Sequence, residues 1–197
     1  MAKSEGKQWI CDALLALAQN RSAADISITE LIHKAGVSRN TFYYHFTGTQ
    51  AVLEYMMDDF LSEYLEAISI PAGETAQELS AESQIELERK VCGYIAGTGK
   101  YVQFFLREDN YRLFCTRFSD AYRAYCDAHV IVQIFPDGHR EPLRHGMVYD
   151  YYVHMSCLQL FAVLECWARC NFSETEEDFI QIFNTLHTTR ITFQGKA

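Results

Sequence analysis

Apolar side chains recur three and four positions apart along most of the chain, the spacing that places them on one face of an α-helix. No strand-type alternation accompanies this period, so the sequence predicts an all-α fold. Residues 71–83 and 133–144 are predicted loops, and Gly97-Thr98-Gly99 is a predicted break. We predict helices over about residues 7–19, 28–35, 39–46, 49–68, 84–96, 101–106, 110–132 and 145–171, and another that starts after Ser173.

Two short helices joined by a tight turn are predicted near the N-terminus. Ser27 and Glu30 have the spacing of a capping box, in which each side chain satisfies a backbone amide of the other residue. Gly36 then supplies the left-handed conformation that ends a helix at least cost. Ser38 is a second N-cap residue and predicts that another helix begins directly after it.

The helix that follows Ser38 is predicted to bury one side and to display the other. Phe42 and Phe46 lie one turn apart and are expected to face inward. The opposite side carries polar-tipped residues that can all form hydrogen bonds, namely Asn40, Thr41, Tyr44 and His45. This combination is typical of a helix that reads DNA in the major groove.

The run G-V-S-R-N-T-F-Y-Y-H-F, residues 36–46, resembles the N-terminal DNA-binding domain of TetR/AcrR-type transcriptional regulators, whose pattern is G-V-S-x-x-T-[LFI]-Y-x-[HY]-F. The resemblance covers about residues 8–65. It implies a three-helix helix-turn-helix domain over residues 1–48 and a larger helical domain for ligand binding and dimerisation over residues 49–197. The implied function is that of a DNA-binding regulator, specifically a ligand-responsive repressor that binds a double-stranded operator.

The same resemblance implies which side chains contact DNA. Tyr44 and His45 are expected on phosphates, and Arg39 and Asn40 are expected to set the sequence preference. The family usually has lysine where this chain has Thr49, which removes one phosphate contact. The full expected set is Ser38, Arg39, Asn40, Thr41, Tyr43, Tyr44, His45 and Thr49.

Net charge does not by itself favour DNA binding, because the chain carries −9. Residues 1–47 hold five lysines and arginines against four carboxylates, a balance of +1, so the remaining residues carry −10. The acidity therefore lies outside the predicted DNA-binding helices. The alternative is that the chain keeps the fold as a protein-interaction module that does not bind DNA.

Residues 145–171 are apolar on two sides. One stripe is Met147, Tyr151, Met155, Leu158 and Ala162, and the other is Val153, Cys157, Leu160, Phe161, Leu164 and Trp167. A helix of this kind must be covered twice. We expect one side to face the core and the other, at Leu160 and Leu164, to face a second copy. Ser173 and Glu176 predict a capping box for the next helix, and the two helices together predict a homodimer interface.

The predicted C-terminal helices also carry aromatic and histidine side chains at inward-facing positions. If they line a cavity, it would take a partly apolar small molecule, an effector of unknown identity. The alternative is that they fill a solid core. The candidate pocket residues are Tyr94, Phe118, Tyr122, Tyr125, His129 and His154.

Catalytic, metal and membrane signatures do not appear in the sequence. It has no H-E-x-x-H, G-x-S-x-G or phosphate-binding glycine loop, so we expect neither an enzyme nor a cofactor. Asp150 and His154 have the i, i+4 spacing of metal ligands, but two residues are too few for a site. No apolar run is long enough to span a bilayer, and the N-terminus lacks an apolar signal core. We therefore expect a cytoplasmic protein.

Overall fold

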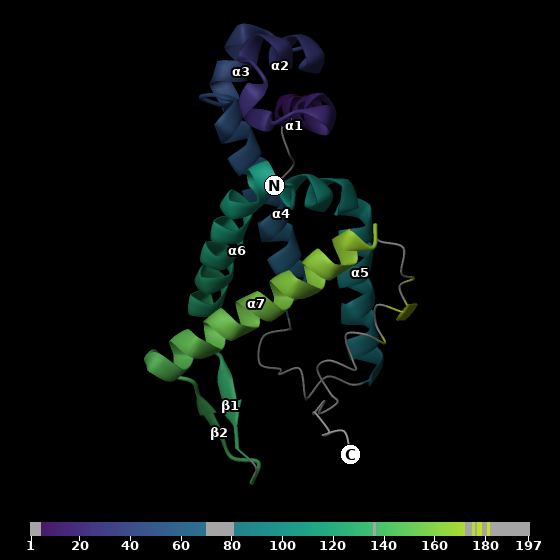
Figure 1. Ribbon diagram of the computed structural model, residues 1–197. Coiled ribbons are helices and arrows are strands. Elements are labelled where there is room, and N and C mark those ends of the chain that lie inside the picture. The colour runs from purple at the N-terminus through teal and green to yellow at the C-terminus, as the bar shows by residue number, and fades with distance from the viewer. Residues whose placement is uncertain are drawn as a thin grey trace, which may run out of the picture.

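The computed structural model describes residues 5–69, 81–135, 137–171, 175, 177–178 and 181, which form helices and one short hairpin. Three helices form a cap at one end, and α4 runs from this cap into a larger group of helices (Figure 1). None of the described helices is both long and apolar enough to cross a membrane. In chain order the elements are α1 (Glu5–Leu17), the 3-10 turns η1 (Ala18–Asn20) and η2 (Ala23–Asp25), α2 (Ile28–Ala35), α3 (Arg39–His45), α4 (Thr49–Ala67), α5 (Ala81–Phe105), α6 (Glu108–Ala128), β1 (Val132–Ile134), β2 (Arg140–Pro142) and α7 (Met147–Arg169).

Local capping fixes the bounds of α2 and the start of α3. The Ser27 hydroxyl accepts the Glu30 amide at 3.2 Å, and the Glu30 carboxylate accepts the Ser27 amide at 2.9 Å, so the predicted capping box forms. Gly36 ends α2 at φ +66°, where a side chain would be strained. The Ser38 hydroxyl accepts the Thr41 amide at 3.0 Å and starts α3. These sequence predictions are confirmed.

Helix α4 connects the cap to the rest of the molecule and packs on α1, α5 and α6. Its apolar side chains, spaced three and four residues apart, are buried and make α4 the centre of the core, while Ile68 at its C-terminal end is half-buried. The buried side chains are Leu53, Met56, Met57, Phe60, Leu61, Tyr64 and Leu65.

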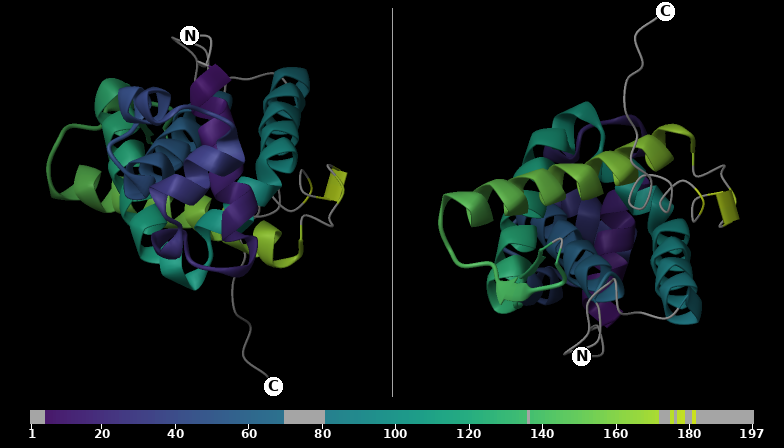
Figure 2. Two further views of the ribbon diagram at one scale, coloured as in Figure 1. Left: turned by 90° about the horizontal axis from the view of Figure 1, so that it is seen from above. Right: turned by 90° about the horizontal axis from the view of Figure 1, so that it is seen from below.

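A cluster of aromatic rings holds the larger group of helices together. Phe105 of α5 lies 5.1 Å from Phe114 of α6 between ring centroids, and Phe60 of α4 lies 5.8 Å from Phe105. Phe161 of α7 covers the cluster, at 5.4 Å from Phe118. Helix α7 crosses the outside of the bundle over α6 and α5, as the two further views also show (Figure 2). One flank of α7 is therefore packed and the other is left outside.

Helix α5 corrects two sequence predictions. It begins at Ala81, inside the predicted loop, and it continues through Gly97-Thr98-Gly99 to Phe105. The two predicted helices are one bent helix (Figure 1). Glycine costs a helix about 1 kcal/mol, and here burial of flanking residues such as Ile95 and Val102 offsets that cost. The Thr98 hydroxyl donates to the Tyr94 carbonyl at 2.7 Å, a bond that bends helices without ending them.

The segment between α6 and α7 also differs from the predicted loop, because β1 and β2 pair antiparallel with Val132 opposite Pro142. Gly138, at φ +83°, allows the tight reversal between the strands. Three residues per strand are too few to produce a recognisable alternation, so the period of the sequence did not predict these strands.

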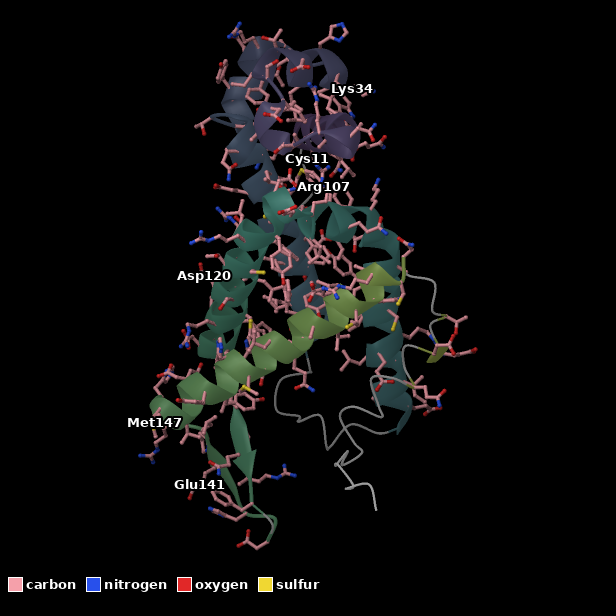
Figure 3. All side chains as sticks on the ribbon, in the orientation of Figure 1. Cys11, Lys34, Arg107, Asp120, Glu141 and Met147 are labelled. Carbon is pink, nitrogen blue, oxygen red and sulfur yellow. The ribbon has the colours of Figure 1, made fainter. Side chains whose placement is uncertain are left out.

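The prediction of which apolar stripe of α7 faces the core is wrong. Leu164 is fully buried within the subunit and Leu160 is half-buried, so this stripe faces the core. The stripe from Met147 to Leu158 is exposed, and Met147 marks its outer end (Figure 3). The predicted cap at Ser173 and Glu176 lies outside the described residues, as does most of the helix predicted after it. A reciprocal cap forms between Thr175 and Asp178, each accepting the other's backbone amide at 3.1 Å.

Candidate nucleic-acid interface

Two phenylalanines decide which side of α3 faces solvent. Phe42 is fully buried and Phe46 is 5% exposed. The Phe46 ring packs edge-on against Tyr55 of α4, 5.5 Å away between centroids. Because Phe42 within this seven-residue helix and Phe46 at its C-cap both face the core, the other side of the helix points away from the protein.

The outward side of α3 gathers most of the predicted DNA-contacting residues. Tyr44 is 85% exposed, and its ring meets His45 edge-on at 4.9 Å. Arg39 and Asn40 are exposed, and the Arg39 guanidinium lies 5.8 Å from the Tyr43 ring. These side chains present hydrogen-bond donors and acceptors together with one fixed positive charge, as a helix in a DNA groove requires.

The remaining predicted residues bond within the protein. The Ser38 and Thr41 hydroxyls lie 2.7 Å apart, and Ser38 also caps α3. Thr49 is half-buried and its hydroxyl donates to the Ile26 carbonyl at 2.9 Å, which ties the start of α4 to the segment before α2. The structure thus gives Thr49 a bond that holds helices together, in place of the phosphate contact of the usual lysine.

Gly6 lies at the interface and carried no recognisable signal in the sequence. A Cβ atom there would lie 3.2 Å from His45 Nε2 and 3.7 Å from Thr41 Cγ2. The first turn of α1 therefore lies directly against α3, and its backbone amides add the positive end of a helix dipole beside His45. Only the tertiary fold reveals this contact, because the two segments are far apart along the chain.

Positive charge on this end of the molecule comes from few side chains. Lys34, at the outer end of α2, is exposed (Figure 3). Arg21 instead pairs with Glu30 at 2.7 Å. The Ser27 hydroxyl, followed by Arg21, lowers the pKa of Glu30 to about 2, so this pair stays ionised at neutral pH.

Two arginines attach the N-terminal helices to the larger bundle, namely Arg107, the N-cap residue of α6, and Arg117 within α6. Arg107 donates to the carbonyls of Ala18 and, at 2.9 Å, of Arg21, which begin and follow the η1 turn after α1. Arg117 pairs with Glu54 at 2.7 Å and with Asp58 at 2.6 Å, both on α4. Helix α6 is therefore bonded both to the segment after α1 and to α4.

The six predicted pocket residues lie in different surroundings. Phe118 and Tyr122 are buried, and the Ser69 hydroxyl donates to Tyr125 at 3.1 Å. His129 follows the end of α6, is exposed and bonds the Tyr125 carbonyl, and His154 is exposed on α7. A cavity of about 80 Å³ between α1, α4 and α5 is lined by Tyr94, and the other five predicted residues do not line this cavity.

Within the described part of the chain, no three His, Cys, Asp or Glu side chains are placed to share an ion. The Asp150 carboxylate accepts a bond from Arg123 at 3.0 Å instead of meeting His154 in a site.

Comparison with known protein families gives a match over the N-terminal helices. Residues 10–56 match the family described as bacterial regulatory proteins, tetR family. The chain is also similar to the HTH-type transcriptional regulator EthR of Mycobacterium tuberculosis, at 42% identity over 55 residues. The match covers 26% of this chain and 26% of that relative, so it spans about a quarter of the relative's length.

Solved structures resemble the chain over nearly its whole length. A putative TetR-family regulator from Syntrophomonas wolfei aligns with a TM-score of 0.64 at 19% identity, covering 94% of each chain. The fatty acid degradation regulator FadR from Bacillus halodurans aligns with a TM-score of 0.59 at 12% identity, covering 94% of this chain and 96% of that one. At these identities the likeness shows the fold.

Proposed function

Since the chain belongs, through its N-terminal helices, to the tetR family of bacterial regulatory proteins, we propose that it is a DNA-binding transcriptional regulator that reads its operator with α3. The observation that supports this most directly is the exposure of Tyr44, Arg39 and Asn40 on one side of a helix whose other side is anchored by Phe42. In this proposal residues 1–48 bind DNA, residues 49–197 bind an effector and a second copy, and the protein acts in the cytoplasm with its DNA.

The proposed active form is a homodimer. Two copies of α3 would enter major grooves about 34–36 Å apart, or a multiple of that distance. The exposed apolar stripe of α7 supports the proposal, because Tyr151 is 70% and Met155 is 62% exposed in one subunit. We assign dimerisation to this stripe, together with the helix that follows α7.

Repression is the proposed mode of control. A dimer that occupies two successive major grooves excludes other proteins from that DNA. An effector that prefers one subunit arrangement would shift the dimer toward it and change operator affinity accordingly. The hydrogen bonds of Arg107 and the ion pairs of Arg117 connect the larger bundle to the helices proposed to face DNA.

A gel-shift titration with the DNA that flanks the protein's own gene tests the proposal. We expect specific binding that weakens steeply with added salt, because phosphate contacts release counterions. Replacing Tyr44 and His45 together by Ala should weaken binding by roughly tenfold or more, with no change in helix content. Ser62→Ala, at an exposed position of α4, is the matched control.

Equal binding by the wild type and the double variant would refute the assignment of α3. Absence of specific binding to any flanking fragment would instead favour the alternative, a protein-interaction module on the same fold. The net charge of −9 and the internal bond of Thr49 are the features that favour this alternative.

A further inference from the structure

Helix α3 presents three rows of side chains outside the core, because residues four apart lie one turn from each other on the same face. The three rows are Asn40 with Tyr44, Thr41 with His45, and Arg39 with Tyr43. The row of Tyr44 is the outermost, opposite the buried Phe42. The row of His45 lies on the flank that meets α1, where a Cβ atom on Gly6 would be 3.2 Å from His45 Nε2. The row of Arg39 lies on the other flank, away from this contact.

The row beside α1 is held by contacts within the protein. The Thr41 hydroxyl lies 2.7 Å from that of Ser38, which also accepts the Thr41 amide at 3.0 Å. The His45 ring contacts the first turn of α1 and meets the Tyr44 ring edge-on at 4.9 Å. These contacts fix the orientation of α3. The side chains with most donors and acceptors left for base edges are therefore in the other two rows.

The third row places the only arginine of α3 over an aromatic ring. The Arg39 guanidinium carbon lies 5.8 Å from the centroid of the Tyr43 ring, within the range of a cation–π contact. The Tyr43 ring is itself fixed, because it meets the fully buried ring of Phe42 edge-on at 5.5 Å. A guanidinium on a ring keeps its hydrogen-bond donors, because all its N–H groups lie in its plane and point away from its faces. Tyr43 thus restricts Arg39 without occupying its N–H groups.

A planar fork of donors matches a base edge that offers two acceptors side by side. In the major groove only guanine does so, through O6 and N7, whereas each of the other three bases presents a donor or a single acceptor. Arg39 is the first residue of α3, at the end of a recognition helix that contacts base edges. A side chain already held by a ring loses less conformational entropy when it forms two bonds at once. A phosphate would accept the same bonds without regard to sequence, so the base contact must be distinguished by experiment.

We propose that Arg39 recognises a guanine of each operator half-site through O6 and N7, and that the Tyr43 ring positions the Arg39 guanidinium for this contact. The inference rests on the proposed function and deepens it, because it names one base that the operator contains. Arg39 touches the base, and Tyr43 acts through Arg39. The role of the Tyr43 ring is therefore separate from any bond that its hydroxyl makes to a phosphate.

The test begins with the full chain and selects bound sequences from random DNA duplexes, so that the operator need not be known beforehand. Fluorescence anisotropy then compares the selected duplex with copies in which one guanine of each half-site is replaced. The replacement is 7-deazaguanine, which lacks N7, or inosine, which keeps O6 and N7 and lacks only the minor-groove amino group. We expect one guanine position at which 7-deazaguanine weakens wild-type binding by about tenfold and inosine changes it little.

Four variants assign this discrimination to its residues. Arg39→Lys keeps the charge but loses the planar fork, and should bind the guanine and 7-deazaguanine duplexes within about twofold of each other. Tyr43→Leu removes the ring and should also reduce the discrimination, whereas Tyr43→Phe keeps the ring and should retain it. Lys34→Gln, at an exposed cation of α2, is the control and should leave the ratio of the two affinities as in the wild type. Circular dichroism checks that each variant is folded.

Each contrary result has a distinct meaning. A selected operator at which no 7-deazaguanine weakens binding, or full discrimination by Arg39→Lys, overturns the guanine contact and leaves the proposed function intact. Full discrimination by Tyr43→Leu, or an equal loss in Tyr43→Phe and Tyr43→Leu, overturns the positioning role of the ring. If no sequence is enriched from the random duplexes, the proposed function fails and the guanine contact fails with it.

Discussion

Two surfaces of this protein expose tyrosines, and they differ in what surrounds the ring. On α3, Tyr44 is 85% exposed among His45, Arg39 and Asn40. On α7, Tyr151 is 70% exposed between Met147 and Met155. The first surface is polar-tipped and charged, and the second is apolar over several turns. An exposed aromatic side chain therefore indicates a function only together with its neighbours.

The cost of leaving each surface in water explains the contrast. Polar tips on α3 remain hydrated in the free protein and, in the proposed DNA complex, would exchange water for phosphate or base edges. Methionine and leucine on α7 gain about 25 cal/mol for each Å² of apolar surface that a partner covers. A contiguous apolar stripe of this kind is typical of a surface that meets another protein. The α3 surface thus suits DNA, and the α7 surface suits a second copy of the chain.

The largest expected effect distinguishes the inner from the outer side of α7. Leu164→Ala leaves a cavity in the core and should lower the free energy of unfolding by about 2–5 kcal/mol. Leu158→Ala, at a side chain that is 50% exposed, should change subunit stability by less than about 1 kcal/mol. Urea denaturation monitored by circular dichroism measures both. Equal losses at the two positions would contradict the assignment of the stripes.

Charge on the outer stripe should dissociate the proposed dimer. Leu158→Glu places two carboxylates in a symmetric interface, one from each copy, and should raise the dimer dissociation constant by at least roughly tenfold. Analytical ultracentrifugation measures the change. Thr116→Glu, at an exposed position of α6, is the control and should sediment as the wild type does. A wild-type protein that is monomeric at micromolar concentration would rule out this interface.

A smaller effect on operator affinity should follow from removing the bonds of Arg107, which attach α6 to the segment after α1. Arg107→Gln removes these charge-assisted bonds, and we expect operator affinity to fall by about threefold to tenfold. Arg112→Gln, at an exposed arginine of the same helix, should change affinity little after correction for net charge. Fluorescence anisotropy with labelled operator compares the two variants. If the two variants lose the same affinity, the loss comes from long-range charge and not from the bonds of Arg107.

The smallest expected effect concerns acid stability of the helix-turn-helix. The pKa of Glu30 is lowered from its ordinary value of 4.5 to about 2 by the Ser27 hydroxyl and then by Arg21. Its contribution to stability is therefore complete above about pH 4.5 and is lost as the pH falls toward 2. Glu30→Gln should flatten the unfolding free energy over that pH window. An identical acid profile in wild type and variant would show that another group controls it.

The sequence by itself determined the elements whose signals are local. The Ser27–Glu30 capping box, the left-handed Gly36 and the Ser38 cap act within four residues, so they form as predicted. The spacing of Phe42 and Phe46 likewise determined which side of α3 is exposed, because a short helix on a core has one possible inner side. The all-α fold and the outward display of Arg39, Asn40 and Tyr44 follow from these signals.

Tertiary packing decided what local signals left open. Both stripes of α7 fit the helical period, and only contact with Phe118 and its neighbours selected the one containing Phe161 and Leu164 for the core. Packing also carried α5 through two glycines, and α6 ended before His129, so that the helical phase no longer aimed this residue inward. Other features depend on segments that are far apart along the chain. They are the contact of Gly6 with His45, the bond from Thr49 to Ile26, and the cavity between α1, α4 and α5. Periodicity describes one helix at a time, whereas these contacts depend on how helices meet.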